Sequence, residues 1–204
     1  MITLVDYGLG NIQAFANIYK NLGIAYSIAR DAEELSRASR LILPGVGAFD
    51  WAMQRLEASG LRPVLDDLVL TQRVPVLGIC VGMQMMANRS EEGCLPGLGW
   101  ISGEVKRFDE SLLSSKKSIP HMGWNDIAPK EHPLFANIVD PRFYFLHSYC
   151  FLPGSAAQVL AETDYGQRFA AAVCREHVIG VQFHPEKSHH WGIQLLQNFA
   201  ELQP

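Results

Sequence analysis

The stretch VPVLGICVGMQMM, residues 74–86, places a cysteine where a buried strand turns into a helix. Residues 74–79 form the short apolar run that is typical of a buried strand, and a helical run follows it. The cysteine, Cys80, has Gly78 and Gly82 two residues to either side. This Gly-x-nucleophile-x-Gly arrangement is typical of a sharp turn that exposes a reactive side chain at the carboxyl edge of a sheet.

Two interpretations of Cys80 are open from this stretch alone. As a nucleophile it would have a strained backbone, and the N-terminus of the following helix would favour its thiolate and offer N–H groups to an oxyanion. As a core residue it would behave as a small buried hydrophobe, which is common for cysteine. The other cysteines, Cys94, Cys150 and Cys174, lack this setting, so the core interpretation is favoured for them.

A cysteine nucleophile needs a base, and the base needs a group that orients it. Of the seven histidines, His184 stands out because Glu186 follows it by two residues in GVQFHPEKS. Residues i and i+2 of an extended chain face the same way, and Pro185 keeps this segment extended or turning. The pair therefore suits a base and its orienting carboxylate, although a solvent-exposed loop would carry the same residues.

The glycine-rich stretch LPGVGAF, residues 43–49, follows a predicted strand. Gly45 and Gly47 tolerate unusual φ angles, so backbone amides of this turn can point inward as an oxyanion hole. A tight strand-to-helix turn without a chemical role would have the same composition. The stretch supports the nucleophile interpretation of Cys80 only in combination with the other motifs.

The first 90 residues alternate between strand and helix patterns. Asp31, followed by Glu34, predicts a capping box at the start of a short helix. Alternation at this spacing implies right-handed crossovers and a parallel sheet that is covered on both faces. Strands are predicted at 2–8, 25–30, 40–45 and 74–79, and helices over 11–22, from Asp31 and up to Arg73.

The second half is richer in short strands, which are joined by short turns. Residues 109–120 form the most polar, loop-like stretch. The sequence therefore predicts one α/β domain over residues 1–204, with a mixed, mostly parallel central sheet flanked by helices. The predicted strands are 99–108, 142–152, 158–163, 168–175 and 178–184, the last two joined by a hairpin, and a final helix covers 191–202.

Composition narrows the classes of function. The 204 residues are 48% hydrophobic and carry a formal charge of −4 without a basic stripe, so nucleic acid is not an expected partner. No run of 18 apolar residues predicts a membrane span, and the first residues read as a strand rather than a signal peptide. The four cysteines form no CxxC pair, so neither a metal site nor disulfides are expected, and reduced thiols suit a cytoplasmic enzyme.

Together, GICVGMQ, LPGVGAF and FHPE resemble the class I (triad) glutamine amidotransferases, which carry a Cys-His-Glu triad on an α/β sheet. The stretches DYGLGN, GLGWISGEVKRF, PHMGWN and YFLHSY extend the resemblance to the glutaminase subunits of imidazole glycerol phosphate synthases. It spans nearly the whole chain, from Asp6 to the last helix.

The resemblance implies a reaction without a cofactor. Cys80 would attack the side-chain amide carbonyl of L-glutamine, His184 would move the proton, and Glu186 would orient His184. Water would then hydrolyse the glutamyl thioester. The residues implied for the oxyanion are Gly45, Val46, Gly47 and Val81, and those implied for glutamine binding are Gln84, Glu92, Ser148 and Tyr149.

The resemblance also implies a partner. Ammonia would pass to a separate (β/α)₈ cyclase subunit and form imidazole glycerol phosphate and the by-product AICAR in histidine biosynthesis. Met122, Trp124, Tyr144 and Lys187 resemble interface positions, although each one also suits ordinary core or surface. Trp124, predicted in a loop beside Pro120 and Gly123, is the best interface candidate because aromatic residues are enriched at interfaces.

Other functions stay open. A paralogous glutaminase subunit would deliver ammonia for the modification of a surface-polysaccharide sugar, and a neighbouring gene would separate it from the histidine pathway. A catalytically silent scaffold or thiol sensor would not need Cys80 for any turnover, and a cysteine peptidase would have no reason to combine GICVGMQ with PGVG. The unusual pair His189 and His190 raises the possibility of a decoy base, but neither has a carboxylate at a matching offset.

Overall fold

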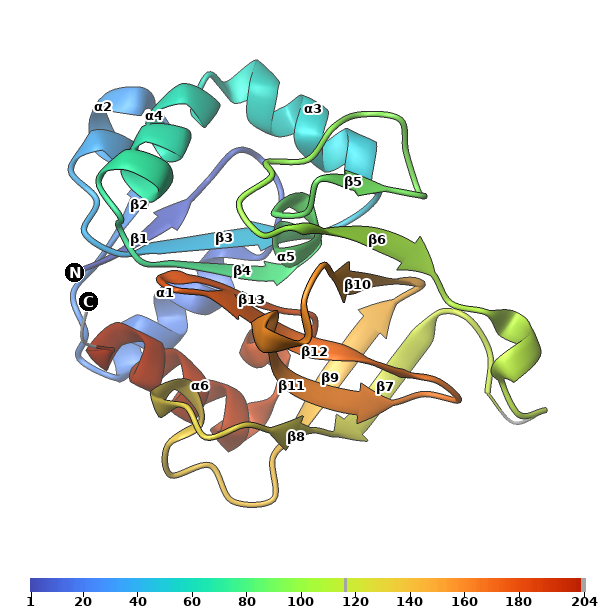
Figure 1. The fold of residues 1–204 in the computed structure, drawn as a ribbon. Helices are drawn as coiled ribbons and strands as arrows, with labels where there is room; N and C mark the ends of the chain where they lie inside the picture. The colour runs from blue at the N-terminus through green and yellow to red at the C-terminus, as the bar shows by residue number, and fades with distance from the viewer. Residues whose placement is uncertain (116, 203–204) are drawn as a thin grey trace.

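The computed structural model describes residues 1–115 and 117–202. Within them, the main sheet has eight strands in the order β2-β1-β3-β4-β13-β12-β11-β8 (Figure 1). The first five strands are parallel and the last three are antiparallel, so the predicted mixed sheet is confirmed. The strands are β1 Ile2–Val5, β2 Tyr26–Ala29, β3 Leu41–Gly45, β4 Val76–Cys80, β8 Ala128–Pro129, β11 Val159–Asp164, β12 Arg168–Arg175 and β13 Val178–Val181.

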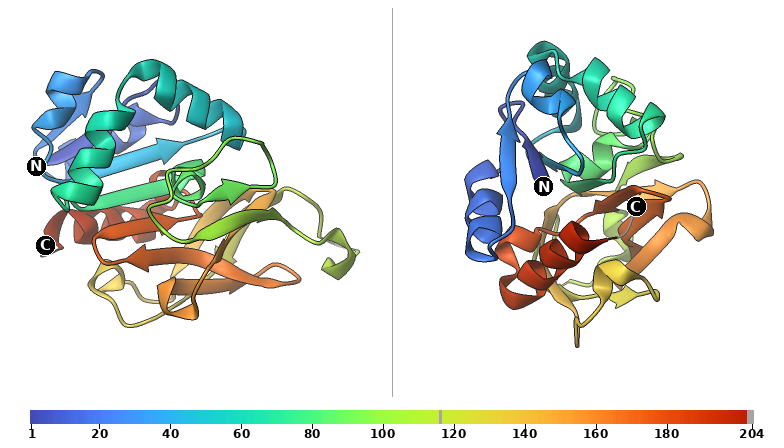
Figure 2. Two further views of the ribbon diagram at one scale, coloured as in Figure 1. Left: turned by 45° about the horizontal axis from the view of Figure 1, so that its top comes forward. Right: turned by 90° about the vertical axis from the view of Figure 1, so that its left-hand side faces the viewer.

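Helices cover both faces of the parallel part of the sheet (Figure 2). Helices α1 (Ile12–Asn21) and α6 (His189–Glu201) lie on one face. On the other lie α2 (Ala32–Ser36), α3 (Phe49–Ser59), α4 (Arg62–Asp66) and α5 (Val81–Met85), and a short π-helix, η1 (Asp67–Thr71), continues α4. β1, β3 and β4 are consequently buried along their whole length, as an apolar parallel strand should be.

The predicted cap of α2 forms, but not as a complete capping box. The Asp31 side chain accepts a hydrogen bond from the Glu34 backbone amide at 2.9 Å. The Glu34 carboxylate accepts from the backbone amide of Arg30 at 2.8 Å, one residue before the expected donor. The helix start was therefore predicted correctly, while the second hydrogen bond shifts by one residue.

The strands of two smaller sheets are inserted in the chain between strands of the main sheet. One has the order β10-β6-β5, with β5 Arg89–Ser90, β6 Gly103–Arg107 and β10 Tyr149–Pro153, and the other pairs β7 (His121–Asp126) with β9 (Arg142–His147). The prediction of one strand over 142–152 is wrong, because the chain leaves β7 after His147 and pairs with β6 from Tyr149 onward. The prediction of a loop around Trp124 is also wrong, because it lies inside β7.

The smaller sheets gather at the carboxyl ends of β3 and β4, whereas the N-terminus and the end of α6 lie at the opposite edge (Figure 1). Short 3-10 turns complete the fold: η2 Glu110–Leu112, η3 Pro133–Phe135, η4 Ala156–Gln158 and η5 Pro185–Lys187. Most of the predicted loop 109–120 is irregular, and its Lys116 lies outside the described residues, as do 203–204 of the predicted domain. This arrangement builds a walled recess over the carboxyl edge.

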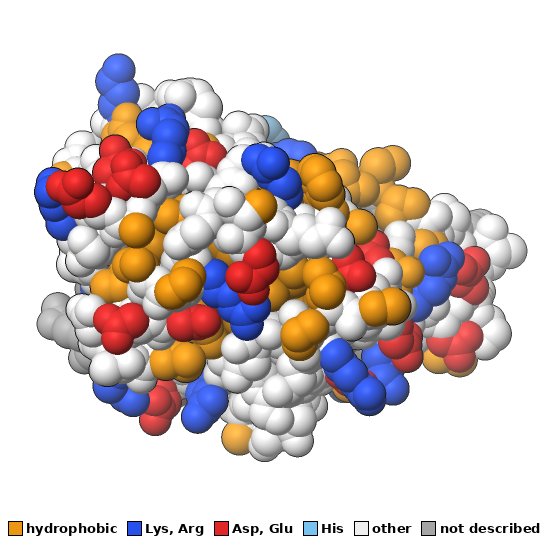
Figure 3. All heavy atoms as spheres, turned by 90° about the horizontal axis from the view of Figure 1, so that it is seen from above, with side chains coloured by type: hydrophobic (Ala, Val, Ile, Leu, Met, Phe, Trp, Pro, Cys, Tyr) orange, Lys and Arg blue, Asp and Glu red, His pale blue; other side chains and the backbone are white. Residues whose placement is uncertain are grey.

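Acidic and basic side chains alternate over the face seen in Figure 3. The formal charge of −4 is therefore not gathered in one acidic or basic field there. Among the helices of the described residues, none is long and apolar enough to cross a bilayer.

Candidate active site

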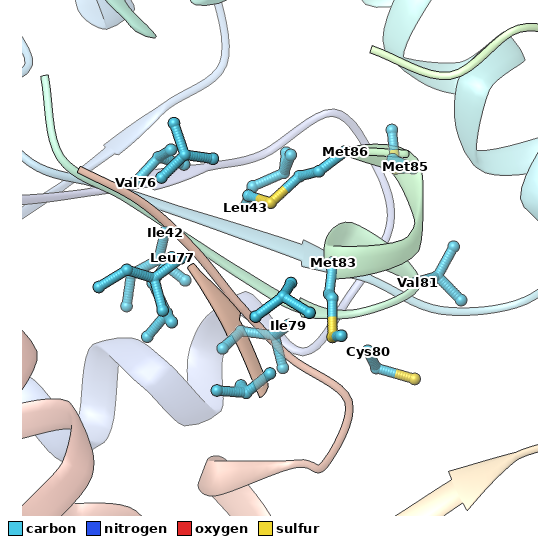
Figure 4. Packing of buried hydrophobic residues seen from close by; sticks show 14 of the residues in the cluster. Ile42, Leu43, Val76, Leu77, Ile79, Cys80, Val81, Met83, Met85 and Met86 are labelled. Carbon is cyan, nitrogen blue, oxygen red and sulfur yellow. The ribbon is translucent and has the colours of Figure 1, made fainter. Parts of the chain in front are cut away.

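The strained turn predicted at Cys80 is present. Cys80 ends β4 with φ 55° and ψ −112°, a backbone conformation that residues other than glycine rarely adopt. A Cβ atom at Gly82 would lie 2.0 Å from the Leu43 carbonyl oxygen, and one at Gly78 would lie 2.8 Å from the Gly82 carbonyl oxygen. Gly82 therefore lets the turn pack directly on β3, and Gly78 lets the residues after Cys80 pack closely on β4. The Cys80 side chain points away from the packed side chains around Ile79 and Met83 (Figure 4).

The predicted helix after Cys80 is present and is short. Helix α5 spans only five residues, Val81–Met85, so its dipole is smaller than that of a long helix. The loop that follows β3 also lies next to Cys80, because Gly45 at the end of β3 pairs in register with Cys80. Val46 and Gly47 follow directly, and Gly47 has φ 83°, which a side chain would disfavour.

Tyr7 is hydrogen-bonded to the end of β3, where this loop begins. Its hydroxyl donates to the Pro44 carbonyl oxygen at 2.7 Å, one residue before Gly45. Burial, with a smaller contribution from Cys80, raises the pKa of Tyr7 above its ordinary range, so the hydroxyl keeps its proton. The tyrosine belongs to the DYGLGN stretch, whose role the sequence alone did not reveal.

His184 and Glu186 form the predicted contact. Nδ1 of His184 lies 2.9 Å from Oε1 of Glu186, and the two side chains are only 5% and 4% exposed. Burial alone would lower the pKa of His184, but hydrogen bonds and charges of Cys80 and Glu186 outweigh it and raise that pKa to about 10. The contact forms across η5 rather than along an extended strand, because β13 already ends at Val181.

Ser188 clamps His184 onto β9. Its buried hydroxyl donates to the His184 carbonyl oxygen at 2.6 Å and accepts from the Tyr144 amide at 3.0 Å. The His184 amide donates to the Tyr144 carbonyl oxygen at 2.8 Å. These three hydrogen bonds fix the backbone that carries the imidazole, and sequence reasoning missed Ser188.

Most of the predicted site residues line one pocket of about 260 Å³ at the carboxyl edge. Glu92, on its wall, accepts from the Phe49 amide at 2.9 Å, and burial raises the pKa of its carboxyl group. Gly45 and Glu186 lie behind the wall, while Met122, Trp124 and Tyr144 lie outside it. The predicted residues on the wall are Val46, Gly47, Cys80, Val81, Gln84, Glu92, Ser148, Tyr149, His184 and Lys187.

A second glutamine, Gln182, connects Cys80 to Gln84. Its Nε2 donates to Cys80 Sγ at 3.7 Å, and its Oε1 accepts from Gln84 Nε2 at 3.0 Å. Gln84 Nε2 also donates to the Tyr149 carbonyl oxygen at 3.0 Å, which leaves Oε1 of Gln84 for a ligand. Sequence reasoning missed Gln182, although its position two residues before His184 was a usable signal.

The outer face of the β7–β9 ribbon is apolar. Met122 pairs with Leu146 and Trp124 pairs with Tyr144 across the strands, so all four side chains lie on one face. Met122 is 65% exposed and Trp124 is 38% exposed. Lys187 Nζ lies 5.8 Å from the centre of the Tyr144 ring, so the four predicted interface residues gather on this face beside the pocket.

The histidines considered as decoy bases lie elsewhere. The ring of His189 stacks on Trp124 at 5.2 Å, and His190 packs against Trp191 at 4.0 Å. Neither lines the pocket that holds Cys80. His147 does line it and has a partner of its own, His121, at 3.1 Å.

The remaining chemistry-bearing groups are separate. All four cysteines are free; Cys150 is buried, whereas Cys94 is exposed, which the core interpretation did not predict. No three His, Cys, Asp or Glu side chains of the described residues gather in a way that could hold a metal ion. A larger hollow, of about 800 Å³, lies at the amino ends of β4 and β13 and contains none of the predicted site residues.

The chain matches the family model "Glutamine amidotransferase class-I" over residues 3–202. It is 55% identical to the imidazole glycerol phosphate synthase subunit HisH of Bdellovibrio bacteriovorus and 48% identical to that of Leptospira interrogans. Each alignment covers 99% of this chain and 100% of the relative.

Solved structures share the fold at low sequence identity. One described as a glutamine amidotransferase has a TM-score of 0.74 at 18% identity and covers 98% of this chain and 99% of that chain. The structure of PurLQS from Thermotoga maritima has a TM-score of 0.71 at 19% identity, with coverage of 98% and 97%. The chain therefore shares its fold with these proteins.

Proposed function

We propose a reaction and a partner for this chain, which belongs to the class-I glutamine amidotransferases and, within them, to the family of HisH subunits of imidazole glycerol phosphate synthase. The proposed reaction is the hydrolysis of L-glutamine to glutamate and ammonia. The main support is that Cys80 and His184 line one pocket while Glu186 holds the imidazole from behind. Residues 1–204 would act as one glutaminase domain in the cytoplasm, where free thiols persist.

The proposed mechanism uses the triad as a unit. Cys80 first gives its thiol proton to His184, whose raised pKa favours the imidazolium, and the Sγ thiolate then attacks the amide carbon of glutamine. The tetrahedral intermediate collapses as His184 gives that proton to the leaving amine, which departs as ammonia and leaves a thioester on Cys80. Water, deprotonated by His184, then attacks the thioester, and glutamate leaves as Cys80 regains its proton. Glu186 stabilises the imidazolium in both half-reactions.

The pocket wall supports roles for the remaining predicted residues. Backbone amides of Val81 and of Gly45, Val46 and Gly47 would stabilise the oxyanion, because these segments flank Cys80 at the ends of β3 and β4. Glu92 would bind the α-ammonium group, since it is the pocket's one carboxylate within the described wall.

Gln84, Ser148 and Tyr149 would hold the rest of the substrate. Their common position on the wall, and the hydrogen bond from Gln84 Nε2 to the Tyr149 carbonyl oxygen, support a jointly positioned binding surface. Substrate held this way would present its amide carbon to Cys80.

The proposed partner is a (β/α)₈ cyclase subunit that receives the ammonia and forms imidazole glycerol phosphate and AICAR in histidine biosynthesis. The exposed apolar face of the β7–β9 ribbon supports this assignment, because exposed aromatic and Met side chains are typical of interfaces. Leu146 and Lys187 belong both to this face and to the pocket wall, so a bound partner would lie next to the site of ammonia release.

Two variants of the complex with the cyclase subunit test the reaction. In Cys80→Ser we expect glutamine-dependent synthesis to fall by about 10⁴-fold or more, since the nucleophile is lost, while synthesis from added ammonium salt stays near wild type. Cys94→Ser, an exposed thiol outside the pocket, is the control and should retain both activities. Equal loss of ammonia-dependent synthesis would contradict the proposed division of labour.

Glutamate release by the chain alone, with the cyclase subunit, and with that subunit plus its ribonucleotide ligand tests the partner. We expect release to rise sharply only in the third state, because the two sites are coupled and ligand binding at the cyclase site then changes the glutaminase site. Flat activity in all three states, with Cys80 still alkylated by a glutamine-like reagent, would favour the paralogous sugar-modifying system. Turnover that does not depend on Cys80 would favour a scaffold or thiol sensor.

A further inference from the structure

A buried hydrogen-bonded chain runs from β7 to the wall of the glutamine pocket. Nδ1 of His121 lies 3.1 Å from Nε2 of His147, and Nδ1 of His147 lies 2.8 Å from the Tyr149 carbonyl oxygen. At its far end, Nδ2 of Asn125 lies 3.4 Å from Nε2 of His121 and also donates to the Asp164 carbonyl oxygen at 3.0 Å. The proposed mechanism does not use either imidazole.

The acceptors in this chain determine where each proton sits. A carbonyl oxygen only accepts, so Nδ1 of His147 must carry a hydrogen. Nε2 of neutral His147 is then an acceptor, which requires the hydrogen of His121 to be on Nδ1. Nε2 of His121 consequently accepts from Asn125. The three contacts are satisfied together by one arrangement of protons, in which both imidazoles are neutral.

The surroundings favour that arrangement. His121 and His147 are 2% and 6% exposed. Burial, with a smaller contribution from Lys117, lowers the pKa of His121 to about 4. Burial, with smaller contributions from His121 and His184, lowers the pKa of His147 to about 3 despite its hydrogen bond to Tyr149. Both rings are therefore uncharged near neutral pH.

Packing holds the His121 ring in place. It lies between Tyr165, at 3.9 Å and 24°, and Phe145, at 4.8 Å and 19°. Its donor atom is consequently fixed toward His147. A phenyl ring would fill the same slot but would leave Nε2 of His147 without a donor, so packing alone does not require a histidine here.

The Tyr149 carbonyl oxygen is where this chain meets the substrate pocket. It accepts from both His147 Nδ1 and Gln84 Nε2, and Tyr149, His147 and Gln84 all line the pocket. If His147 changes to its Nε2–H form, the Tyr149 carbonyl oxygen loses one of its two donors, and the backbone at 148–149 can relax. That movement would shift the surface proposed to hold glutamine while the triad stays where it is.

We propose that His121 is a positioning residue, which holds His147 in its Nδ1–H form and thereby fixes the Tyr149 carbonyl that shapes the glutamine pocket. The inference rests on the proposed glutaminase function and extends it to a residue that does not touch substrate. It also gives a role to His147, whose second nitrogen would otherwise be a free base beside Cys80 and His184.

Two substitutions of His121 separate this role from packing, measured as glutamate release by the complex with the cyclase subunit in the presence of its ribonucleotide ligand. In His121→Phe the ring remains and the donor is lost, and we expect KM for glutamine to rise about tenfold with kcat within about twofold of wild type. In His121→Asn the donor remains near the Nδ1 position and the ring is lost, and we expect KM to rise less than about threefold. Tyr165→Phe, which keeps the stacked ring, is the control.

A role in packing alone predicts the reverse order, with His121→Asn more damaging than His121→Phe, and that result would overturn the proposal. An unchanged KM in His121→Phe would overturn it as well. A wild-type complex that releases no glutamate even with that ligand present would instead contradict the proposed function.

The tautomer can be read without turnover. Two-bond nitrogen–proton spectra of histidine-labelled protein should show the Nδ1–H form of His147 in the wild type and in His121→Asn. In His121→Phe that single form should be lost, because Nε2 no longer has a donor. An Nε2–H form of His147 in the wild-type protein would overturn the proposal whatever the kinetics show.

Discussion

Two imidazoles line the pocket beside Cys80, and their pKa values are shifted in opposite directions. His184, just beyond the end of β13, contacts the Glu186 carboxylate, and Cys80 and Glu186 together raise its pKa to about 10 despite burial. His147, at the end of β9, contacts the neutral ring of His121, and burial lowers its pKa to about 3. Both side chains are buried and both face the same recess.

The difference shows that the partner, rather than the residue type or its burial, sets the role of each histidine. Burial disfavours the charged form of both rings. Only His184 has a carboxylate to offset that cost, so only His184 is suited to exchange a proton with Cys80. Substitutions that remove a partner, or the clamp that holds it, test this distinction.

The largest expected effect comes from His184→Ala. We expect glutamine hydrolysis in the complex to fall by about 10⁴–10⁶-fold, as much as loss of Cys80, because members of a triad act as a unit. Synthesis from added ammonium salt should continue. His190→Ala, an exposed histidine outside the pocket, is the control. Near-normal hydrolysis in His184→Ala would mean that His147 or another group serves as the base.

Glu186→Gln should have the next largest effect. The substitution keeps the shape but removes the carboxylate, so we expect kcat to fall by about 10³-fold and the pKa of His184 to fall toward its ordinary value. Steady-state glutamate release and an NMR titration of His184 measure the two changes. Glu176→Gln, an exposed residue at the opposite edge, controls for the charge. A His184 pKa that stays near 10 would show that Cys80 alone sets it.

Ser188→Ala tests the clamp that holds His184 on β9. Removal of the hydroxyl breaks its hydrogen bonds to the His184 carbonyl and the Tyr144 amide, so we expect the free energy of unfolding to fall by about 1–3 kcal/mol. We also expect kcat to fall roughly tenfold, because the imidazole is less well placed. Denaturant unfolding measures the first change. Ser39→Ala, an exposed serine, should be near neutral, and equal effects of the two variants would argue against the clamp.

The smallest expected effect is on the pH dependence of stability. The folded-state pKa values of His121 and His147 lie below the ordinary 6.5, so the unfolded chain binds protons first as pH falls. The free energy of unfolding should therefore fall by about 1 kcal/mol per histidine between pH 6.5 and 5.5. His184 has the opposite sign: its contribution is complete below pH 6.5 and is lost as pH rises toward about 10.

The double variant His121→Asn/His147→Gln isolates the acid-side change. Between pH 6.5 and 5.5 its free energy of unfolding should fall by about 2 kcal/mol less than that of the wild type, measured by denaturant unfolding at each pH. His132, whose pKa is also lowered by burial, is present in both proteins and cancels from the difference. Identical slopes for wild type and double variant would mean that the two imidazoles titrate normally.

Local patterns predicted the parts of the site that are close in sequence. Gly78 and Gly82 around Cys80 predicted a strained turn, and the offset between His184 and Glu186 predicted their contact. The same patterns missed the break at Ser148, because the apolar, strand-like composition continues through 142–152 while the neighbouring strand changes from β7 to β6. Such a pattern reports on burial, not on which strand is the neighbour.

By itself, the sequence determined the parallel α/β sheet, the nucleophile turn and the base with its carboxylate, because each depends on residues a few positions apart. Only the tertiary structure decided which histidine was paired with which group. His121 and His147 are 26 residues apart, and Gln84 and Gln182 are 98 apart, so no local pattern relates them. The pairing of β7 with β9 and the placement of β13 beside β4 bring those groups together. Burial then determines whether these groups are charged, because the free-energy cost of burying an ion depends on the surrounding atoms.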